Sequence, residues 1–400
     1  MGAEVIKIEH PTGDDTRRWG PPYSHGESAY FISCNRNKLS ISVDLKVKES
    51  VEIVERLVQR SDILVHNFVT GGAESLGLGY ERVSILNPRI IYCAISGFGS
   101  TGVYAKKPGY DALISAMYGM QHITGPENGP PTRPGVAVTD VLTGILSYGA
   151  ICAALHERNT SGLGQKIDTS LMESQLSSLV NVASSYLVTG KDSSQRWGTA
   201  HPSIVPYQNF LCSDDKYLSL AIGNDLQFRM FCQSLFETNL LTDDEISFLF
   251  EPSTLSTEHP LPKSEFQKNP DRVKNRRILI PIIQQIFQKE TMAFWTNLLD
   301  QKGFPIGPVR NIEESFSCPQ AVERGMVQEV EHPTIGKLSV VGPPIKFSRT
   351  PCTIRLPPPL LGQHTREILQ DLLHYSESDV DHYIHCGAIR EISQVPSSGK

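Results

Sequence analysis

Short apolar runs alternate with amphipathic stretches along the first part of the chain. Residues 48–60 repeat their apolar side chains with the period of a helix, and residues 80–87, ended by Pro88, predict a second, shorter helix. The apolar runs that predict strands occupy residues 3–9, 39–45, 62–68, 89–96 and 165–171. Strands that alternate with helices form a parallel sheet covered on its faces by those helices. The pattern therefore predicts an α/β fold with a doubly wound, mostly parallel sheet.

The longest apolar run covers residues 141–155 and is rich in small side chains. It is too short to span a bilayer, so we predict a buried helix and expect no membrane partner. The given sequence begins with the strand predicted at residues 3–9, and we expect no transit or signal peptide.

The hydrophobic pattern restarts after a polar break at residues 190–201 and predicts a second, smaller α+β domain. A strand at 216–222 is followed by amphipathic helices at 226–236, 277–287 and 292–299. Residues 240–275 are polar and poorly periodic, so we expect a surface excursion there. We predict a large domain over 1–195, a small domain over 205–335, a connector and C-terminal helix over 336–388 that return to the large domain, and a disordered tail over 389–400.

Composition excludes several classes of protein. The 400 residues suffice for two domains, and 39% apolar with 20% charged residues is typical of globular proteins. A net charge of −6 gives no indication of a nucleic-acid partner. The eight cysteines contain no CxxC pair, which argues against a zinc site or a disulfide framework, and we predict no metal site.

Asp140 is the only charged residue between Arg133 and His156. It directly precedes the predicted helix at 141–155, where aspartate commonly caps free backbone N–H groups. It also has small neighbours, and a helix N-terminus keeps a carboxylate ionised. A helix cap and a nucleophile are therefore both open interpretations, and they do not exclude each other.

Other candidate residues lie at the ends of predicted strands. Lys46, Asn67 and Phe68 lie at or just after strand ends, at the sheet edge where doubly wound folds bind ligands. Lysine at such a position is also a common solvated surface charge. His201 lies in a glycine-containing approach to Pro202 and is a candidate for a substrate loop.

Two motifs that suggest a cofactor site or a catalytic acid favour structural roles instead. Residues 97–102 match GxGxxG after a predicted strand, but the following VYAKKP is a loop rather than the helix that a dinucleotide site requires. Glu173 is placed as the third residue of a helix capped by Ser170, which we prefer to a role as a catalytic acid.

Several longer stretches resemble one family in order along nearly the whole chain. They include GAEVIKIEHPTGDDTR (2–17), DILVHNFVTGGAESLGLGYE (62–81), NPRIIYCAISGFG (87–99), GPPTRPGVAVTD (129–140), HPSIVPYQNF (201–210) and PPPLLGQHT (357–365). The chain thereby resembles the class III CoA-transferases, which include formyl-CoA:oxalate and carnitine CoA-transferases. The resemblance implies transfer of CoA from an acyl-CoA such as succinyl-CoA to a dicarboxylic acid such as glutarate.

The resemblance also implies roles for individual residues. Asp140, in its Gly-x-Ala-x-x-Asp setting, matches the nucleophile that carries CoA as a thioester. The implied contacts with CoA are His10, Lys46, Asn67, Phe68 and Tyr110. Gly198 and His201 match a glycine-rich loop that shields the intermediate from water. Coenzyme A enters as a thioester substrate, so no separate cofactor is implied.

The nearest enzymatic alternative is an α-methylacyl-CoA racemase. Racemases have histidine as a second base at the position of Tyr110, and a phenol is a poor base at neutral pH, so Tyr110 favours the transferase. The family further implies an interlocked homodimer and a mitochondrial location. Its members begin with one more strand and helix, which we expect to be missing here, so an inactive isoform that binds partners is a second alternative.

Overall fold

The computed structural model describes residues 2–257, 259–303 and 305–391, and they fall into two compact units. Unit 1 contains the described parts of Met1–Ile114, Ala137–Ser178 and Glu313–Lys400. Unit 2 contains Ser115–Val136 and the described parts of Leu179–Ile312. The domain boundaries given by the sequence stay a prediction.

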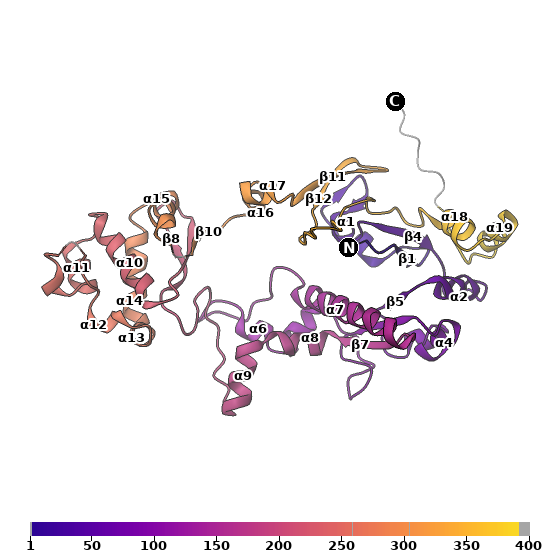
Figure 1. Ribbon diagram of the computed structural model, residues 1–400, viewed down its shortest axis with the longest axis horizontal. Coiled ribbons are helices and arrows are strands. Elements are labelled where there is room, and N and C mark those ends of the chain that lie inside the picture. The colour runs from indigo at the N-terminus through magenta and orange to yellow at the C-terminus, as the bar shows by residue number, and fades with distance from the viewer. Residues whose placement is uncertain (1, 258, 304, 392–400) are drawn as a thin grey trace. The chain divides into compact units, whose positions relative to one another are not determined.

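Unit 1 contains two parallel sheets (Figure 1). In one, β6 (Ile91–Ser96) pairs with β5 (Ile63–His66) and with β7 (Lys166–Ser170). In the other, β1 (Val5–Glu9) pairs with β4 (Lys38–Ser42). The alternation of strands and helices in the sequence therefore gives parallel pairing, and the predicted α/β class is confirmed.

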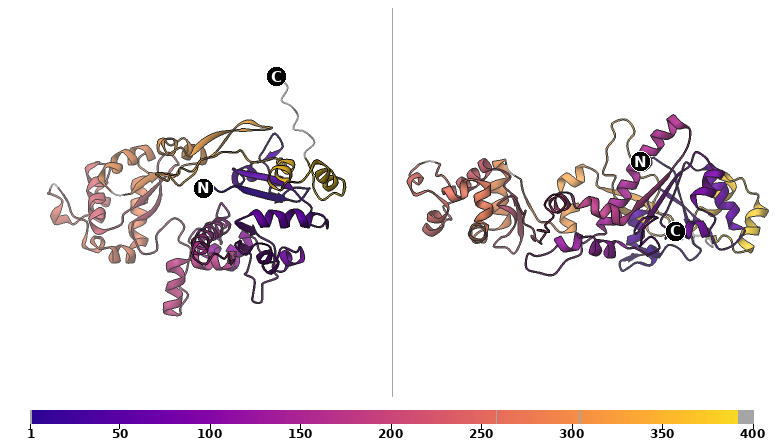
Figure 2. Two further views of the ribbon diagram at one scale, coloured as in Figure 1. Left: turned by 45° about the vertical axis from the view of Figure 1, so that its right-hand side comes forward. Right: turned by 90° about the horizontal axis from the view of Figure 1, so that it is seen from below.

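Helices and a C-terminal segment complete the core of unit 1. The helices α2 (Ser50–Arg60) and α4 (Tyr80–Leu86) bury their apolar faces in one cluster with residues of β4 and β6. The C-terminal α18 (Thr365–Glu367), the π-helical turn Ile368–Leu372 and α19 (Glu377–His385) add to that cluster. Figure 2 shows this yellow segment beside the indigo N-terminal strands, where the Ser40 N–H donates to Nδ1 of His364 over 3.1 Å.

The remaining elements of unit 1 are short. They are a 3₁₀ turn at Asp15–Arg18, β2 (Tyr23–Ser24), β3 (Glu27–Ser28), α1 (Ala29–Cys34), α3 (Gly72–Ser75), α8 (Leu171–Ser178), α17 (Pro319–Glu323), and the hairpin of β11 (Val327–His332) and β12 (Gly336–Val341). Ile389 was predicted to lie in a disordered tail, but it is buried and bridges Val43. The predicted disordered tail is therefore wrong at Ile389. The part of that prediction over residues 392–400 lies outside the described residues.

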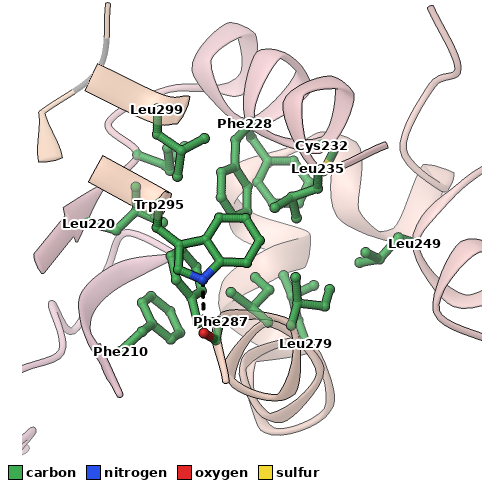
Figure 3. Close-up of a cluster of buried hydrophobic side chains, with 14 of the residues drawn as sticks. Phe210, Leu220, Phe228, Cys232, Leu235, Leu249, Leu279, Phe287, Trp295 and Leu299 are labelled. Atoms are coloured by element: carbon green, nitrogen blue, oxygen red, sulfur yellow. Dashed lines mark hydrogen bonds between the residues drawn. The ribbon is translucent and has the colours of Figure 1, made fainter. Parts of the chain in front are cut away.

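Unit 2 is built on an antiparallel sheet of β8 (Tyr207–Leu211), β9 (Tyr217–Ala221) and β10 (Ile306–Pro308), with β9 in the middle. Its longer helices are α9 (Val180–Thr189), α10 (Asp225–Glu237), α14 (Arg276–Phe287) and α15 (Met292–Leu299). Figure 3 shows Trp295 at the centre of the core, its indole N–H donating to the Phe287 carbonyl over 2.8 Å.

Described residues within 240–275 contribute to the core of unit 2, so the predicted surface excursion is wrong. They form α11 (Asp243–Leu249), α12 (Ser264–Gln267) and α13 (Asn269–Lys274). Phe250 and Phe266 are fully buried there. The apolar residues of this segment do not recur with a helical or strand period, so the sequence pattern did not predict their burial.

The helix α7 (Val138–Ser161) differs most from its prediction. It packs on β6, β7 and α8, and Figure 1 shows it running beside β7. Its buried residues are largely polar (Thr139, Thr143, Ser147, Ala154 and Arg158). Val141 and Ile145, by contrast, are 59% and 62% exposed. The prediction of a buried helix is wrong for this chain, and α7 is long and apolar enough to meet the length and composition of a membrane span.

Candidate active site

The first turn of α7 is capped by a carboxylate from elsewhere in the chain. Ala137 occupies the N-cap position and has no capping side chain. Asp111, at the start of α5 (Asp111–Met117), is only 6% exposed, and its Oδ2 accepts the N–H groups of Thr139 over 2.9 Å and Asp140 over 3.4 Å. Asp111 therefore caps α7, and Asp140 is not its N-cap.

Asp140 is consequently the third residue of the helix, with an exposed side chain. The positive end of the helix dipole favours a negative charge at this position. The preceding residue is held firmly, because the Thr139 hydroxyl donates to Gln175 of α8 over 2.6 Å and the Thr143 hydroxyl donates to the Thr139 carbonyl over 2.7 Å. The backbone under Asp140 is thus anchored to two other elements.

Asp140 is the predicted nucleophile, so replacing Asp111 by alanine is expected to lower kcat about 10- to 100-fold with little change in KM, because small displacements of a reacting group cost rate. Asp111→Asn keeps one acceptor oxygen and should recover most of the loss. Initial rates and thermal melts together measure this. The control is Ser376→Ala, which removes the cap of α19. A fall in kcat for that variant as large as for Asp111→Ala would contradict the prediction.

The loop after β6 contains several glycines and folds back so that Gly97 meets Gly109, the residue before Tyr110. A Cβ atom on Gly97 would lie 2.7 Å from the Cα of Gly109, so both positions require glycine. Tyr110 is 69% exposed. Of the GxGxxG glycines, Gly97 therefore serves this close backbone approach, in agreement with the sequence argument against a dinucleotide site.

Four of the five predicted CoA contacts, His10, Lys46, Asn67 and Phe68, form two local groups in unit 1. At the end of β1, Nε2 of His10 lies 3.7 Å from Asp44, and the Asp44 carboxylate also accepts the N–H of Lys46 over 3.0 Å. At the end of β5, Asn67 and Phe68 lead to Thr70, whose hydroxyl donates to the Gly99 carbonyl over 3.4 Å. His10 and Lys46 are thus linked through Asp44, and Asn67 and Phe68 adjoin the loop that follows β6.

Gly198 and His201 belong to unit 2. The Gly198 N–H donates to the Gly125 carbonyl over 2.9 Å, at a φ of +60° that suits glycine. The His201 ring stacks on Tyr207 with centroids 5.4 Å apart. Arg276 lies under this loop, 4.4 Å from the centre of the Trp197 ring, and it donates to the His201 carbonyl over 2.9 Å.

Two further carboxylates have structural roles. The Ser170 hydroxyl accepts the Glu173 N–H over 3.1 Å and donates to its carboxylate over 2.5 Å, so the predicted capping contact is confirmed. Asp168 accepts the N–H of Ser100 over 3.3 Å and anchors the loop after β6. Among the described residues, no group of three or more histidine, cysteine or acidic side chains is placed to hold a metal ion.

Sequence reasoning missed Asp111, His66 and Arg276. Asp111 follows Tyr110 directly in the chain, but no local pattern pairs it with residues 139 and 140. His66 lies inside the strand predicted at 62–68 and has no metal-ligand spacing, and Arg276 directly precedes the amphipathic helix predicted at 277–287. Their partners are distant in sequence, so only the fold identifies them.

Comparison with known proteins places this chain in a family. The family model "CoA-transferase family III" matches residues 1–250 and 253–365. The chain is 44% identical over 392 residues to succinyl-CoA:glutarate CoA-transferase of Mus musculus, covering 98% of this chain and 85% of that protein. It is 39% identical over 384 residues to succinate–glutarate CoA-transferase of Agrobacterium fabrum, covering 93% of this chain and 89% of that protein.

A solved structure shows the same fold. The crystal structure of a CAIB/BAIF family protein from Brucella suis matches with a TM-score of 0.79 and 36% identity, covering 93% of this chain and 92% of that one. The chain therefore belongs to CoA-transferase family III, and it is an enzyme of that family. The resemblance seen in the sequence motifs is confirmed.

Proposed function

We propose that this enzyme transfers CoA from succinyl-CoA to glutarate or a similar dicarboxylic acid through a thioester on Asp140. The observation that carries the proposal is the exposed carboxylate of Asp140 on the capped first turn of α7. The succinyl-CoA:glutarate and succinate–glutarate names of the relatives support this choice of substrates.

The reaction proceeds in four acyl transfers. The Asp140 carboxylate attacks the succinyl-CoA carbonyl, forming a mixed anhydride and releasing CoA thiolate. The thiolate attacks the aspartyl carbonyl, which gives the aspartyl-CoA thioester and free succinate. Glutarate attacks that thioester and releases thiolate again, and the thiolate takes the glutaryl group and restores the carboxylate. Covalent catalysis divides one difficult exchange into easier steps.

The other predicted residues have supporting roles in this proposal. His10, Lys46, Asn67, Phe68 and Tyr110 contact the CoA moiety, and the loop of Gly198 and His201 excludes water from the thioester. Water exclusion is essential because hydrolysis would lose the activation that the acceptor must receive.

The direct test is to incubate the purified chain with succinyl-CoA and glutarate and to separate the CoA esters by chromatography. Glutaryl-CoA should form in step with the loss of succinyl-CoA. A racemase would instead exchange the α-proton of a 2-methylacyl-CoA with deuterated solvent. Exchange without glutaryl-CoA formation would contradict the proposal, and so would a chain that forms no new CoA ester with any dicarboxylic acid.

We also propose that the two parallel sheets of unit 1 are halves of one doubly wound sheet. Among the described strands, β1 pairs only with β4 and β5 only with β6, so each half has an edge at which a further strand can pair. We further propose that the chain divides into a large nucleotide-type domain and a small domain.

We also propose a mitochondrial location, as the family resemblance implies. Fluorescence microscopy of the tagged protein in cells tests it.

The apolar face of α7 supports the interlocked homodimer. Val141, Ile145, Tyr148 and Cys152 are exposed and follow one another at helical spacing on this helix. We propose that a second copy covers this stripe. Because the stripe lies on the helix that carries Asp140, assembly and active-site geometry are linked.

Ile145→Glu is expected to convert the dimer largely to monomer at micromolar concentration, because it places a charge in an apolar interface. Analytical ultracentrifugation in detergent-free buffer measures this. Ile85→Glu is the control, since Ile85 is also exposed but lies on α4. A wild-type monomer, or a wild-type protein that partitions into vesicles, would contradict the dimer.

A further inference from the structure

A chain of hydrogen bonds runs from the end of β5 into the core of unit 1. The Phe68 N–H donates to Nδ1 of His66 over 3.2 Å, and Nε2 of the same ring lies 2.8 Å from the Tyr92 hydroxyl. That hydroxyl donates to the Leu78 carbonyl over 2.9 Å. Because Nδ1 accepts a hydrogen bond, the neutral ring carries its proton on Nε2 and donates to Tyr92. Each bond in this chain therefore has a single direction.

The His66 ring also holds the side chain of Phe68. The two rings stack with centroids 5.2 Å apart and an angle of 27° between their planes. Tyr92 is buried and meets the imidazole edge-on at 5.1 Å, and Tyr80 of α4 packs on Tyr92 in turn. One neutral imidazole thus holds both the backbone and the ring of Phe68 against a rigid aromatic core.

We propose that His66 is a positioning residue for the acyl-CoA substrate, holding the turn at Asn67 and Phe68 in its CoA-binding conformation. The inference rests on the proposed function, in which these two residues contact CoA. His66 acts through the turn and does not touch the reacting atoms. Its loss should therefore affect KM and CoA affinity, while the acyl transfers at Asp140 keep their kcat.

Protonation of His66 would break this arrangement, because Nδ1 would then carry a hydrogen that opposes the Phe68 N–H. The charged groups that face the ring are Glu74 of α3 and Lys166 of β7. Burial lowers the pKa of His66 and outweighs Glu74, so the ring is neutral at pH 7. Burial also raises the pKa of Tyr92 to about 12, which keeps that hydroxyl a donor. CoA affinity should therefore be full above pH 6.5 and fall as the pH drops through the lowered pKa.

Two substitutions separate the hydrogen bond from the packing. His66→Phe keeps a flat ring that stacks on Phe68 but lacks both nitrogens. We expect it to raise KM for succinyl-CoA about tenfold, as for a buried amide left without an acceptor, to leave kcat within about twofold, and to abolish the pH dependence. His66→Asn offers an oxygen to the same N–H two residues ahead and does not titrate, so it should restore most of the affinity.

His332 provides a matched control in the same unit. Its Nδ1 also accepts the N–H of the residue two positions ahead, Thr334, over 3.4 Å, and burial lowers its pKa as well. It lies in the β11–β12 hairpin and interacts with the Pro358 backbone, and none of the five predicted CoA contacts lies on that hairpin. His332→Phe should leave KM and its pH dependence unchanged even where the melting temperature falls.

The experiment is calorimetric titration of CoA into the wild type and the three variants between pH 5.5 and 7.5, with steady-state kinetics on the same samples. A specific loss of CoA affinity in His66→Phe, reversed in His66→Asn, supports the inference. Equal affinity and pH dependence in His66→Phe and the wild type overturn it, as do equal losses in His66→Phe and His332→Phe. A wild type that neither binds CoA nor transfers it overturns both the proposed function and this inference. If the wild type binds and transfers CoA, the variants test the role of His66 alone.

Discussion

Replacing Asp140 by alanine is expected to abolish CoA transfer, with kcat lowered about 10³-fold or more, as for the loss of a covalent nucleophile. No other exposed carboxylate of this helix lies in its first turn. Binding of CoA should persist, because the proposed CoA contacts lie on other elements. The measurement is glutaryl-CoA formation, together with calorimetric titration of CoA.

Trapping identifies the residue directly. Hydroxylamine added during turnover should convert the aspartyl-CoA thioester into a hydroxamate, and peptide mass mapping should place it on Asp140. Asp243→Ala is a matched control, since it removes an exposed acid from the first turn of α11 and should leave the rate unchanged. A hydroxamate on any other residue, or full exchange by Asp140→Ala, would remove the basis of the mechanism.

Replacing Arg17 by methionine is expected to lower the free energy of unfolding of unit 1 by about 3–5 kcal/mol, the cost of leaving a buried charge without its partner. The Glu9 side chain is fully buried, and Arg17 donates to its two oxygens over 2.8 and 2.9 Å. The same guanidinium donates to the Pro359 carbonyl over 3.0 Å and lies 3.7 Å from the centre of the Phe31 ring. One cation thus joins β1 to the C-terminal segment, next to His10.

This ion pair also predicts a pH dependence. Burial by itself would raise the pKa of Glu9, but the hydrogen bonds and charge of Arg17, together with the Ser40 hydrogen bond and the charge of Lys7, outweigh it, so the pKa lies below its ordinary value. The stabilisation is therefore complete above about pH 4.5, the ordinary glutamate value, and is lost as the pH falls through the lowered pKa. Wild-type unfolding should follow this trend, and the Arg17→Met variant should lose it.

Urea unfolding followed by circular dichroism measures both effects. The control is Arg82→Met, which removes an exposed ion pair with Glu55 and should change stability by less than about 1 kcal/mol. The double variant Glu9→Gln with Arg17→Met should recover part of the loss, because it removes the buried charge. Equal stability of Arg17→Met and Arg82→Met would show that the buried pair does not stabilise the unit.

Much of unit 1 could be predicted from the sequence because its elements carry their own signals. The run at 91–96 is strongly apolar and bounded by turns, and the helix at 50–60 has a regular apolar face. The strand ends at Asn67 and Phe68 followed from the same pattern. By contrast, Phe250 and Phe266 lie in a segment without periodicity, and their burial depends on which elements pack over them.

The helix that carries Asp140 shows the limit of such reasoning. Its apolar residues were expected to be buried, yet α7 turns Thr139, Thr143 and Ser147 toward the sheet and leaves Val141 and Ile145 exposed. Hydrophobicity predicts that apolar side chains need cover, but it does not say whether the same chain or a second copy supplies it.

The sequence by itself determined the α/β class, the family and the identity of Asp140 as the candidate nucleophile, because these depend on local periodicity and on contiguous motifs. Only the tertiary structure decided that Asp111 caps α7, that His66 holds the turn after β5, and that Arg17 joins Glu9 to the C-terminal segment. The physical reason is the same in each case. Hydrogen bonds and ion pairs between residues far apart in the chain form only after the fold has brought their atoms within about 3 Å, and no local pattern records that distance.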